Sequence, residues 1–472
     1  MMKRLFIFLF IFSVLTLTAQ NKKSYKIELK IKGVEDSVLY LANYYGDKTF
    51  LVDTTVRKGK NNYLFEGKKH LDGGIYIIVG QEKNTIFEFL ISDSQHLKFD
   101  SDMKNLIEEM KVKGSNENSL FFDYLAHSNI QFKQLKSYQH QIKNLNHNND
   151  SIAILNKKIE ELNSDIVDYK EAIIEAYPKA FISHFFLAMK SPETNKSIII
   201  SKEDSILAFK NYKKHYWDYM DFNDDRLIRT PVFHNKLEYY FNAVAHPAPD
   251  SLIKEIDAFL NRLDEKSKLY EYSLWHLTLK FDQSHRMGYD AILVHFANNY
   301  YAKGKAPWLN AEVLKNILTE AKKRSNSLIG KKGPNLVMQN LDLSPISMYS
   351  IDKNYTILYF WSPKCGHCKV ETPKLLEFYK QNKEKMDLEV FAVCADTNMQ
   401  AMRTYIDEHK LNWINVNGPR SYTQNFHELY NVYSTPFIFV LDKNKTIIAK
   451  QIKSNQLFDF ISNYEKIKQN KK

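Results

Sequence analysis

Two cysteines separated by two residues carry the clearest chemical signal in this chain of 472 residues. Cys365 and Cys368 enclose Gly366 and His367. This spacing brings the two sulfur atoms within bonding distance, so the pair can cycle between a dithiol and a disulfide. The thiolate is the reactive form, and a pair of this kind at the start of a helix lowers the thiol pKa from about 8.5 to about 3.5–7.5.

The neighbouring residues predict the elements that would position this pair. Residues 355–360 are apolar and β-rich, which is typical of a central strand buried on both faces. Residues 369–379 favour a helix, so the cysteines fall in a strand-to-helix turn. The free N–H groups and partial positive charge of a helix start favour a thiolate. We therefore predict that the more exposed Cys365 attacks, and that Cys368, one turn into the helix, resolves the mixed disulfide.

The remaining residues near the pair favour redox chemistry over a structural role. His367 adds partial positive charge beside Cys365, which predicts a reduction potential in the middle of the range known for such pairs. That value is compatible with either direction of electron flow. A zinc site would need a second Cys or His pair, and a structural disulfide closing so small a loop would gain little entropy. We therefore expect no metal and no cofactor.

The C-terminal region, residues 326–472, resembles the thioredoxin-like family of the exported TlpA/ResA type. The matching residues are Phe360, Trp361, Cys365, Gly366, His367, Cys368, Glu371, Pro373, Thr435 and Pro436. The resemblance implies an α/β thioredoxin-like fold and thiol-disulfide oxidoreductase activity on protein thiols or disulfides. The segment Cys365-Gly366-His367-Cys368 is also similar to the active-site segment of protein disulfide isomerases.

Specific roles follow from this resemblance alone. It places Thr435 and Pro436 in a cis-proline loop facing the cysteines. It implies a partly buried, proton-shuttling carboxylate at Glu371; an ordinary exposed helical glutamate is the alternative. Lys364 stands where the family commonly has Trp, and it could stabilise the thiolate or steer acidic partners. The predicted partner-contact residues are Trp361, Lys364, His367, Thr435 and Pro436.

The third cysteine needs a separate explanation. Cys394 follows a predicted strand at 388–393, and we interpret it as a buried, unreactive thiol; a redox-sensing cysteine is the alternative. The predicted domain is completed by helices at 398–409 and 456–468 and by a hairpin of strands at 436–441 and 446–452.

The first residues indicate export. Lys3 and Arg4 precede an apolar run from Leu5 to Leu17, which is typical of a secretory signal peptide cleaved after Ala19. An uncleaved N-terminal membrane anchor is the alternative. We expect the protein in the periplasm or cell envelope. Its three cysteines are too few for a fold stabilised by disulfides.

Two further regions separate the signal peptide, residues 1–19, from the C-terminal domain. Residues 20–112 contain short strands at roughly ten-residue spacing, which predicts a small antiparallel sandwich or barrel. Residues 113–325 are helical, with an apolar heptad seam at 151–177 that Pro178 ends. This seam predicts one arm of a helical hairpin, or alternatively a coiled-coil dimer. Residues 330–335 are the predicted linker. The fold class is thus multidomain: β, then α, then α/β.

Charge and composition limit the partners. Lys and Arg number 66 against 55 Asp and Glu, but the excess is spread along the chain, so we do not expect nucleic-acid binding. The helical region contains histidines without zinc-ligand spacing, which we expect to be satisfied or exposed: His234, His246, His276, His285 and His295.

The N-terminal regions resemble accessory domains of Gram-negative envelope proteins. The expected partners are envelope proteins with thiols or disulfides, including a membrane or periplasmic redox partner. A binding or scaffold protein with a secondary redox domain is the alternative function. The oligomeric state stays open.

Overall fold

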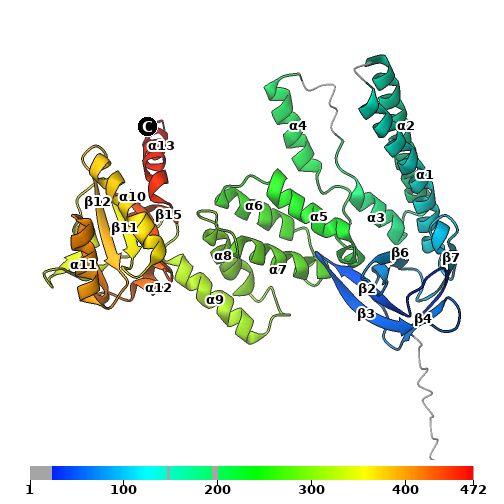
Figure 1. Ribbon diagram of the computed structural model, residues 1–472, viewed down its shortest axis with the longest axis horizontal. Coiled ribbons are helices and arrows are strands. Elements are labelled where there is room, and N and C mark those ends of the chain that lie inside the picture. The colour runs from blue at the N-terminus through cyan, green and yellow to red at the C-terminus, as the bar shows by residue number, and fades with distance from the viewer. Residues whose placement is uncertain (1–23, 146–148, 194–199, 471–472) are drawn as a thin grey trace, which may run out of the picture. The chain divides into compact units, whose positions relative to one another are not determined.

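The computed structural model describes residues 24–145, 149–193 and 200–470 (Figure 1). The chain packs into two compact units, one ending at Tyr240 and the other beginning at Phe241. The predicted signal peptide, residues 1–19, lies outside the described residues. Within the described ranges, no helix combines the length and apolar character needed to cross a bilayer.

The first unit begins with eight strands in two four-stranded sheets, ordered β4-β1-β7-β8 and β3-β2-β5-β6. Buried and exposed residues alternate along β1, β4 and β7, and buried residues from both sheets form one core, so the region is a sandwich. All strand pairs are antiparallel except β1 with β7, which is parallel. The strands are β1 Tyr25–Lys32, β2 Val38–Tyr45, β3 Lys48–Val56, β4 Asn62–Gly67, β5 Gly74–Val79, β6 Thr85–Ile91, β7 His96–Asp102 and β8 Lys111–Lys113.

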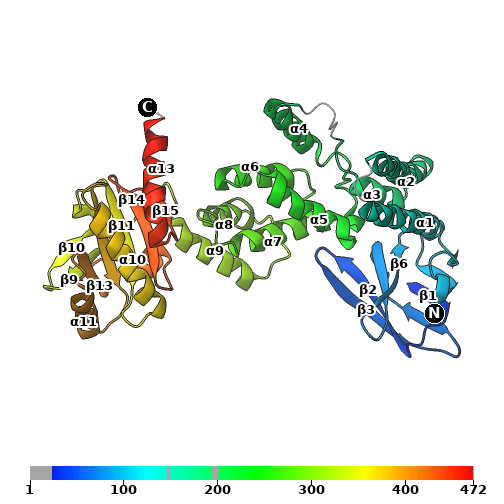
Figure 2. The same cartoon turned by 45° about the horizontal axis from the view of Figure 1, so that its top comes forward.

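Helices complete the first unit. The heptad seam is confirmed as one arm of a helical hairpin, because α1 and α2 lie side by side (Figures 1 and 2). Seam residues Leu155, Ile166 and Ile173 of α2 are buried. The helices are α1 Asn116–Asn144, α2 Asn149–Ala176, α3 Phe181–Met189, α4 Lys202–His215 and α5 Pro231–Tyr239.

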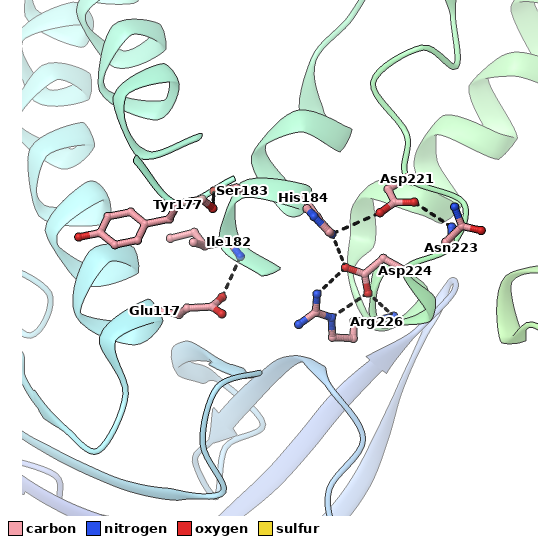
Figure 3. Close-up of polar contacts among 9 residues, drawn as sticks. All are labelled: Glu117, Tyr177, Ile182, Ser183, His184, Asp221, Asn223, Asp224 and Arg226. Atoms are coloured by element: carbon pink, nitrogen blue, oxygen red, sulfur yellow. Dashed lines mark hydrogen bonds and ion pairs between the residues drawn. The ribbon is translucent and has the colours of Figure 1, made fainter. Parts of the chain in front are cut away.

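Two sets of polar contacts join α1 to α3 and α3 to the turn η3, Asp225–Arg229 (Figure 3). Asp224 accepts hydrogen bonds from Nε and Nη2 of Arg226, both at 2.7 Å, and lies 2.7 Å from Nδ1 of His184. Glu117, near the start of α1, accepts the N–H of Ile182 at 2.9 Å. Burial opposes ionisation of Asp224, but the Arg226 contacts outweigh it and lower the pKa of Asp224. The Asp224 carboxylate is therefore a charged connection between α3 and η3.

The second unit starts with a helical region, as predicted for residues up to 325. Within this region α8 ends at Phe296 and continues as the π-helical turn η5, Ala297–Tyr301. A similar π-turn, η4, spans Tyr240–Val244. The α-helices are α6 Pro249–Leu260, α7 Lys268–Asp282, α8 Asp290–Phe296 and α9 Ala311–Ser325.

The C-terminal part of this unit is a seven-stranded sheet of order β10-β9-β13-β12-β11-β14-β15. Residues of α10, α11 and α13 pack on one face, and α12 packs on the other. The strands are β9 Val337–Asn340, β10 Pro345–Ser347, β11 Tyr355–Trp361, β12 Leu388–Cys394, β13 Ile414–Ser421, β14 Phe437–Asp442 and β15 Ile447–Lys450. The helices are α10 Gly366–Asn382, α11 Met399–His409, α12 Phe426–Tyr430 and α13 Leu457–Gln469.

The predicted linker at 330–335 is attached to the edge of this sheet. The N–H of Gly330 donates to the carbonyl of Ile447 at 2.8 Å, and the N–H of Ile447 donates to the carbonyl of Lys331 at 2.8 Å. The buried Lys450 ammonium contacts Asp290 of α8 and donates to the Ser327 carbonyl. The segment between helices and sheet therefore covers the outer side of β15.

Candidate active site

The sequence places Cys365 at the junction of β11 and α10. All seven residues of β11 are buried, and its chain leaves the sheet through a short turn at 362–364. Cys365 is the N-cap residue of α10, and its Sγ accepts the N–H of Cys368 at 3.1 Å. The Cys365 thiol also donates to the carbonyl oxygen of Thr435 at 3.1 Å. The helix start therefore points an N–H group at the sulfur, as the sequence predicted.

The two thiols have opposite environments. Both are free, but Cys365 is half-buried and Cys368 is fully buried. Partial burial opposes ionisation of Cys365, but hydrogen bonds with the side chains of Cys368 and Thr435 and with the backbone N–H groups of Cys368 and His367 outweigh it and lower the pKa of Cys365. Burial raises the pKa of Cys368 to about 12, with a contribution from the neighbouring Cys365. Only Cys365 therefore combines access to a partner with a stabilised thiolate.

The proline loop lies against the outer thiol. The Thr435–Pro436 peptide bond is cis, as the resemblance implied, and both residues are half-buried. The carbonyl of Thr435 contacts the Cys365 sulfur directly. The structure thus brings together four of the predicted site residues, two from the helix start and two from the loop before β14.

The other predicted contact residues have different surroundings. His367 is exposed beside Cys365, on the surface that a partner would meet. Lys364 reaches away to Asp396, with its Nζ at 3.2 Å from Oδ2. Trp361 is fully buried, and the centroid of its ring lies 5.0 Å from the ring centroid of Tyr405. Because Trp361 is a core residue of β11, its ring does not reach the partner-facing surface in this structure.

Comparison with known proteins agrees with this geometry. A family model described as thioredoxin-like matches residues 352–447. The thiol-disulfide oxidoreductase ResA of Bacillus thuringiensis is 29% identical over 141 residues, which are 29% of this chain and 77% of ResA. The C-terminal domain is a thioredoxin-like thiol-disulfide oxidoreductase of the TlpA/ResA type.

Solved structures are also similar to this thioredoxin-like domain. A domain of a possible thiol-disulfide isomerase from Cytophaga hutchinsonii is 39% identical, and the match covers 30% of this chain and 97% of that one, with a TM-score of 0.29. StoA from Bacillus subtilis is 22% identical over 27% of this chain and 96% of its own, with a TM-score of 0.24. Two family models, each described as a domain of unknown function, match residues 25–121 and 182–324.

Glu371 lies one turn after Cys368 on α10 of the thioredoxin-like domain. The residue is half-buried, and its Oε1 accepts the N–H of Ser454 at 2.6 Å. Positions three apart on a helix share a face, so the carboxylate is on the same side of α10 as the resolving cysteine. Pro373 lies inside this helix, where the resemblance placed it.

Cys394 ends β12 and is fully buried, which confirms that it is a core thiol. Burial raises the pKa of Cys394 to about 11. The described part of the chain contains no group of three or more His, Cys, Asp or Glu side chains that could hold a metal ion.

Sequence reasoning missed one residue near the site. Asp396 follows β12, and its carboxylate pairs with Lys364, which follows the neighbouring parallel strand β11. The carboxyl ends of adjacent parallel strands meet at one edge of a sheet, so these two residues become detectable as neighbours only when the two strands are known to pair side by side.

Proposed function

We propose that this chain is an exported oxidoreductase that exchanges disulfides with proteins of the periplasm or cell envelope, with Cys365 as nucleophile and Cys368 as resolving thiol. The observation that carries the proposal is the opposite environment of the two thiols. Cys365 is accessible at a helix start and has a lowered pKa, whereas Cys368 is buried with a raised pKa. Residues 326–472 would perform the exchange, and residues 20–112 and 113–325 would be accessory domains.

The proposed reaction has two exchange steps. The Cys365 thiolate attacks one sulfur of a partner disulfide, forms a mixed disulfide and releases the other partner sulfur as a thiolate. Cys368 then loses its proton and attacks the Cys365 sulfur. This second step forms the Cys365–Cys368 disulfide and releases the partner as a dithiol. The same steps in reverse would oxidise a partner.

The second step needs a proton acceptor, because a thiol with a pKa of about 12 is almost entirely protonated at neutral pH. Glu371 is the proposed acceptor, since it follows Cys368 by one helical turn and is only half-exposed. The bond from the Ser454 N–H fixes the carboxylate in place. In the reverse direction Glu371 would return the proton to Cys368.

Partner contact is proposed for the surface around the outer thiol. His367 and the loop of Thr435 and Pro436 flank the sulfur of Cys365, so a polypeptide joined to that sulfur must contact them.

Trapping tests the roles of the two thiols. In Cys368→Ser, the second step is blocked, so mixed disulfides with envelope proteins should accumulate through Cys365. Cys365→Ser is the matched variant and should trap almost nothing, because the remaining active-site thiol is buried and protonated. Equal trapping by the two variants would refute the assignment. The reduction potential of the parent would show which direction the pair favours.

A further inference from the structure

A groove lies directly beside the outer thiol. It is a cavity of about 420 Å³ between the ends of β11 and β12 on one side and the proline loop on the other. Its lining includes Ser362, Asp396, His427, Tyr433 and Thr435. Because the Thr435 carbonyl contacts the Cys365 sulfur, the groove begins where a bonded partner chain would leave that sulfur.

The groove contains one strongly acidic group. The Asp396 side chain is only 9% exposed, yet it stays ionised: the backbone N–H of Asn398 donates to it at 2.9 Å, and this bond outweighs burial and lowers its pKa. A nearly buried carboxylate strongly disfavours an acidic neighbour and favours a cation.

The cation now on Asp396 is weakly held. Lys364 places its Nζ 3.2 Å from one carboxylate oxygen and 3.4 Å from the other, and its own side chain is 70% exposed. Ion pairs with one long, exposed partner contribute little and exchange readily. A guanidinium could instead bind both oxygens of one carboxylate from within the groove.

We propose that this groove is a subsite for a cationic side chain of the substrate polypeptide, close in sequence to its reactive cysteine, which replaces Lys364 on Asp396. The inference rests on the proposed function, since it assumes that Cys365 bonds to the substrate. The placement supports this: Asp396 and Thr435 line the same groove, and the Thr435 carbonyl contacts the Cys365 sulfur, so the groove receives the residues that flank a cysteine bonded to Cys365.

Replacement of Lys364 would also affect the nucleophile. Once displaced from Asp396, the Lys364 ammonium would be released next in sequence to Cys365, and a positive charge near the sulfur would stabilise its ionised form. Binding of a cationic substrate would therefore be coupled to activation of the thiol that attacks it. Asp396 is a specificity-determining residue in this scheme and does not itself touch the reacting sulfurs.

Matched peptides test the subsite. Each carries one cysteine as a neutral 2-pyridyl disulfide and, beside it, arginine, its uncharged isostere citrulline, or glutamate. The second-order rate of attack by the reduced full chain is divided by the rate with 2-mercaptoethanol, which removes differences in intrinsic reactivity. We expect arginine to exceed citrulline by about threefold to tenfold at low salt, with glutamate slowest, and the difference to shrink at high salt.

Three variants locate the effect. Asp396→Asn keeps an oxygen for the Asn398 N–H but loses the charge, so the arginine preference should disappear. Lys364→Met removes the competing cation, so the preference should increase. Asp407→Asn is the control, because it removes the same charge from an exposed position on the neighbouring helix α11 and should keep the parent preference.

The outcomes separate the two proposals. If the parent shows no arginine preference, or if the preference survives in Asp396→Asn, the cation subsite is overturned. In that case the citrulline peptide still reports normal exchange at Cys365. Failure of every peptide to react with Cys365 instead overturns the proposed function, and the subsite with it.

Discussion

Selective alkylation measures the difference between the two active-site thiols. The pKa of Cys365 lies below the ordinary thiol value of about 8.5, whereas that of Cys368 is about 12. At pH 7 the thiolate fraction of Cys365 is therefore at least about a thousand times that of Cys368. The thiolate of higher pKa is intrinsically more nucleophilic, by about thirtyfold for this difference, so Cys365 should react at least about thirty times faster.

The assay is a time course with limiting iodoacetamide on the reduced full chain, read by peptide mass spectrometry. Cys394 is an internal control, because it is fully buried with a pKa of about 11 and should remain unmodified with Cys368. Labelling should increase with pH until the Cys365 thiol is ionised. If Cys368 is labelled within threefold of Cys365, the assigned asymmetry is wrong, and the order of attack and resolution with it.

Four further predictions concern the surroundings of the pair and the first unit. Glu371→Gln keeps an acceptor for the Ser454 N–H but should slow resolution by about tenfold to a thousandfold while attack by Cys365 is unchanged; identical pH profiles of both half-reactions in variant and parent would contradict this. Cys394→Ser should keep exchange activity within a few-fold of the parent, whereas a relay role would show as lost turnover and a Cys394-linked disulfide. Arg226→Ala leaves the Asp224 charge with fewer partners and should lower the local stability around α3 by about 3 kcal/mol, measured by hydrogen exchange. Because the pKa of Asp224 is lowered in the folded state, its carboxylate contributes to folding stability above about pH 4, and this contribution is lost as the pH falls through the folded pKa. Asp224→Asn should remove this acid sensitivity. An unchanged stability profile at acid pH would refute the assignment.

The reactive pair and its supporting elements could be predicted because local sequence determines them. β11 is a continuous apolar run because it is buried on both faces, and the predicted strand differs from it by one residue. The helix start at Cys365 follows from the change of pattern after the turn. These signals depend on neighbouring residues only.

Elements whose partners are distant in sequence were missed. β13 contains Asn415 and Asn417, which are buried and read as loop residues. The Asn415 side chain is satisfied by Trp413 and by the carbonyl of Leu411, so a polar residue is tolerated inside the sheet. The short strands β8 and β10 have three residues each, too few for a periodic pattern.

Distance in sequence also explains the missing part of the site. Lys364 alone suggested a cation available to the thiolate, and its pairing with Asp396 depends on the register of β11 and β12.

The backbone bonds between residues 330–333 and β15 affect how the redox domain can be isolated. A fragment starting at Asn335 would lose Gly330 and Lys331, and with them the hydrogen bonds to Ile447. It would expose the side of a strand whose four residues are all buried in the intact chain. Open, apolar strand edges recruit other chains, so this fragment should self-associate in solution. A fragment that begins at Asn310, the capping residue of α9, retains the covering segment and should remain monodisperse, which makes Asn310 a better starting point for expression than the glycine-rich boundary in the sequence.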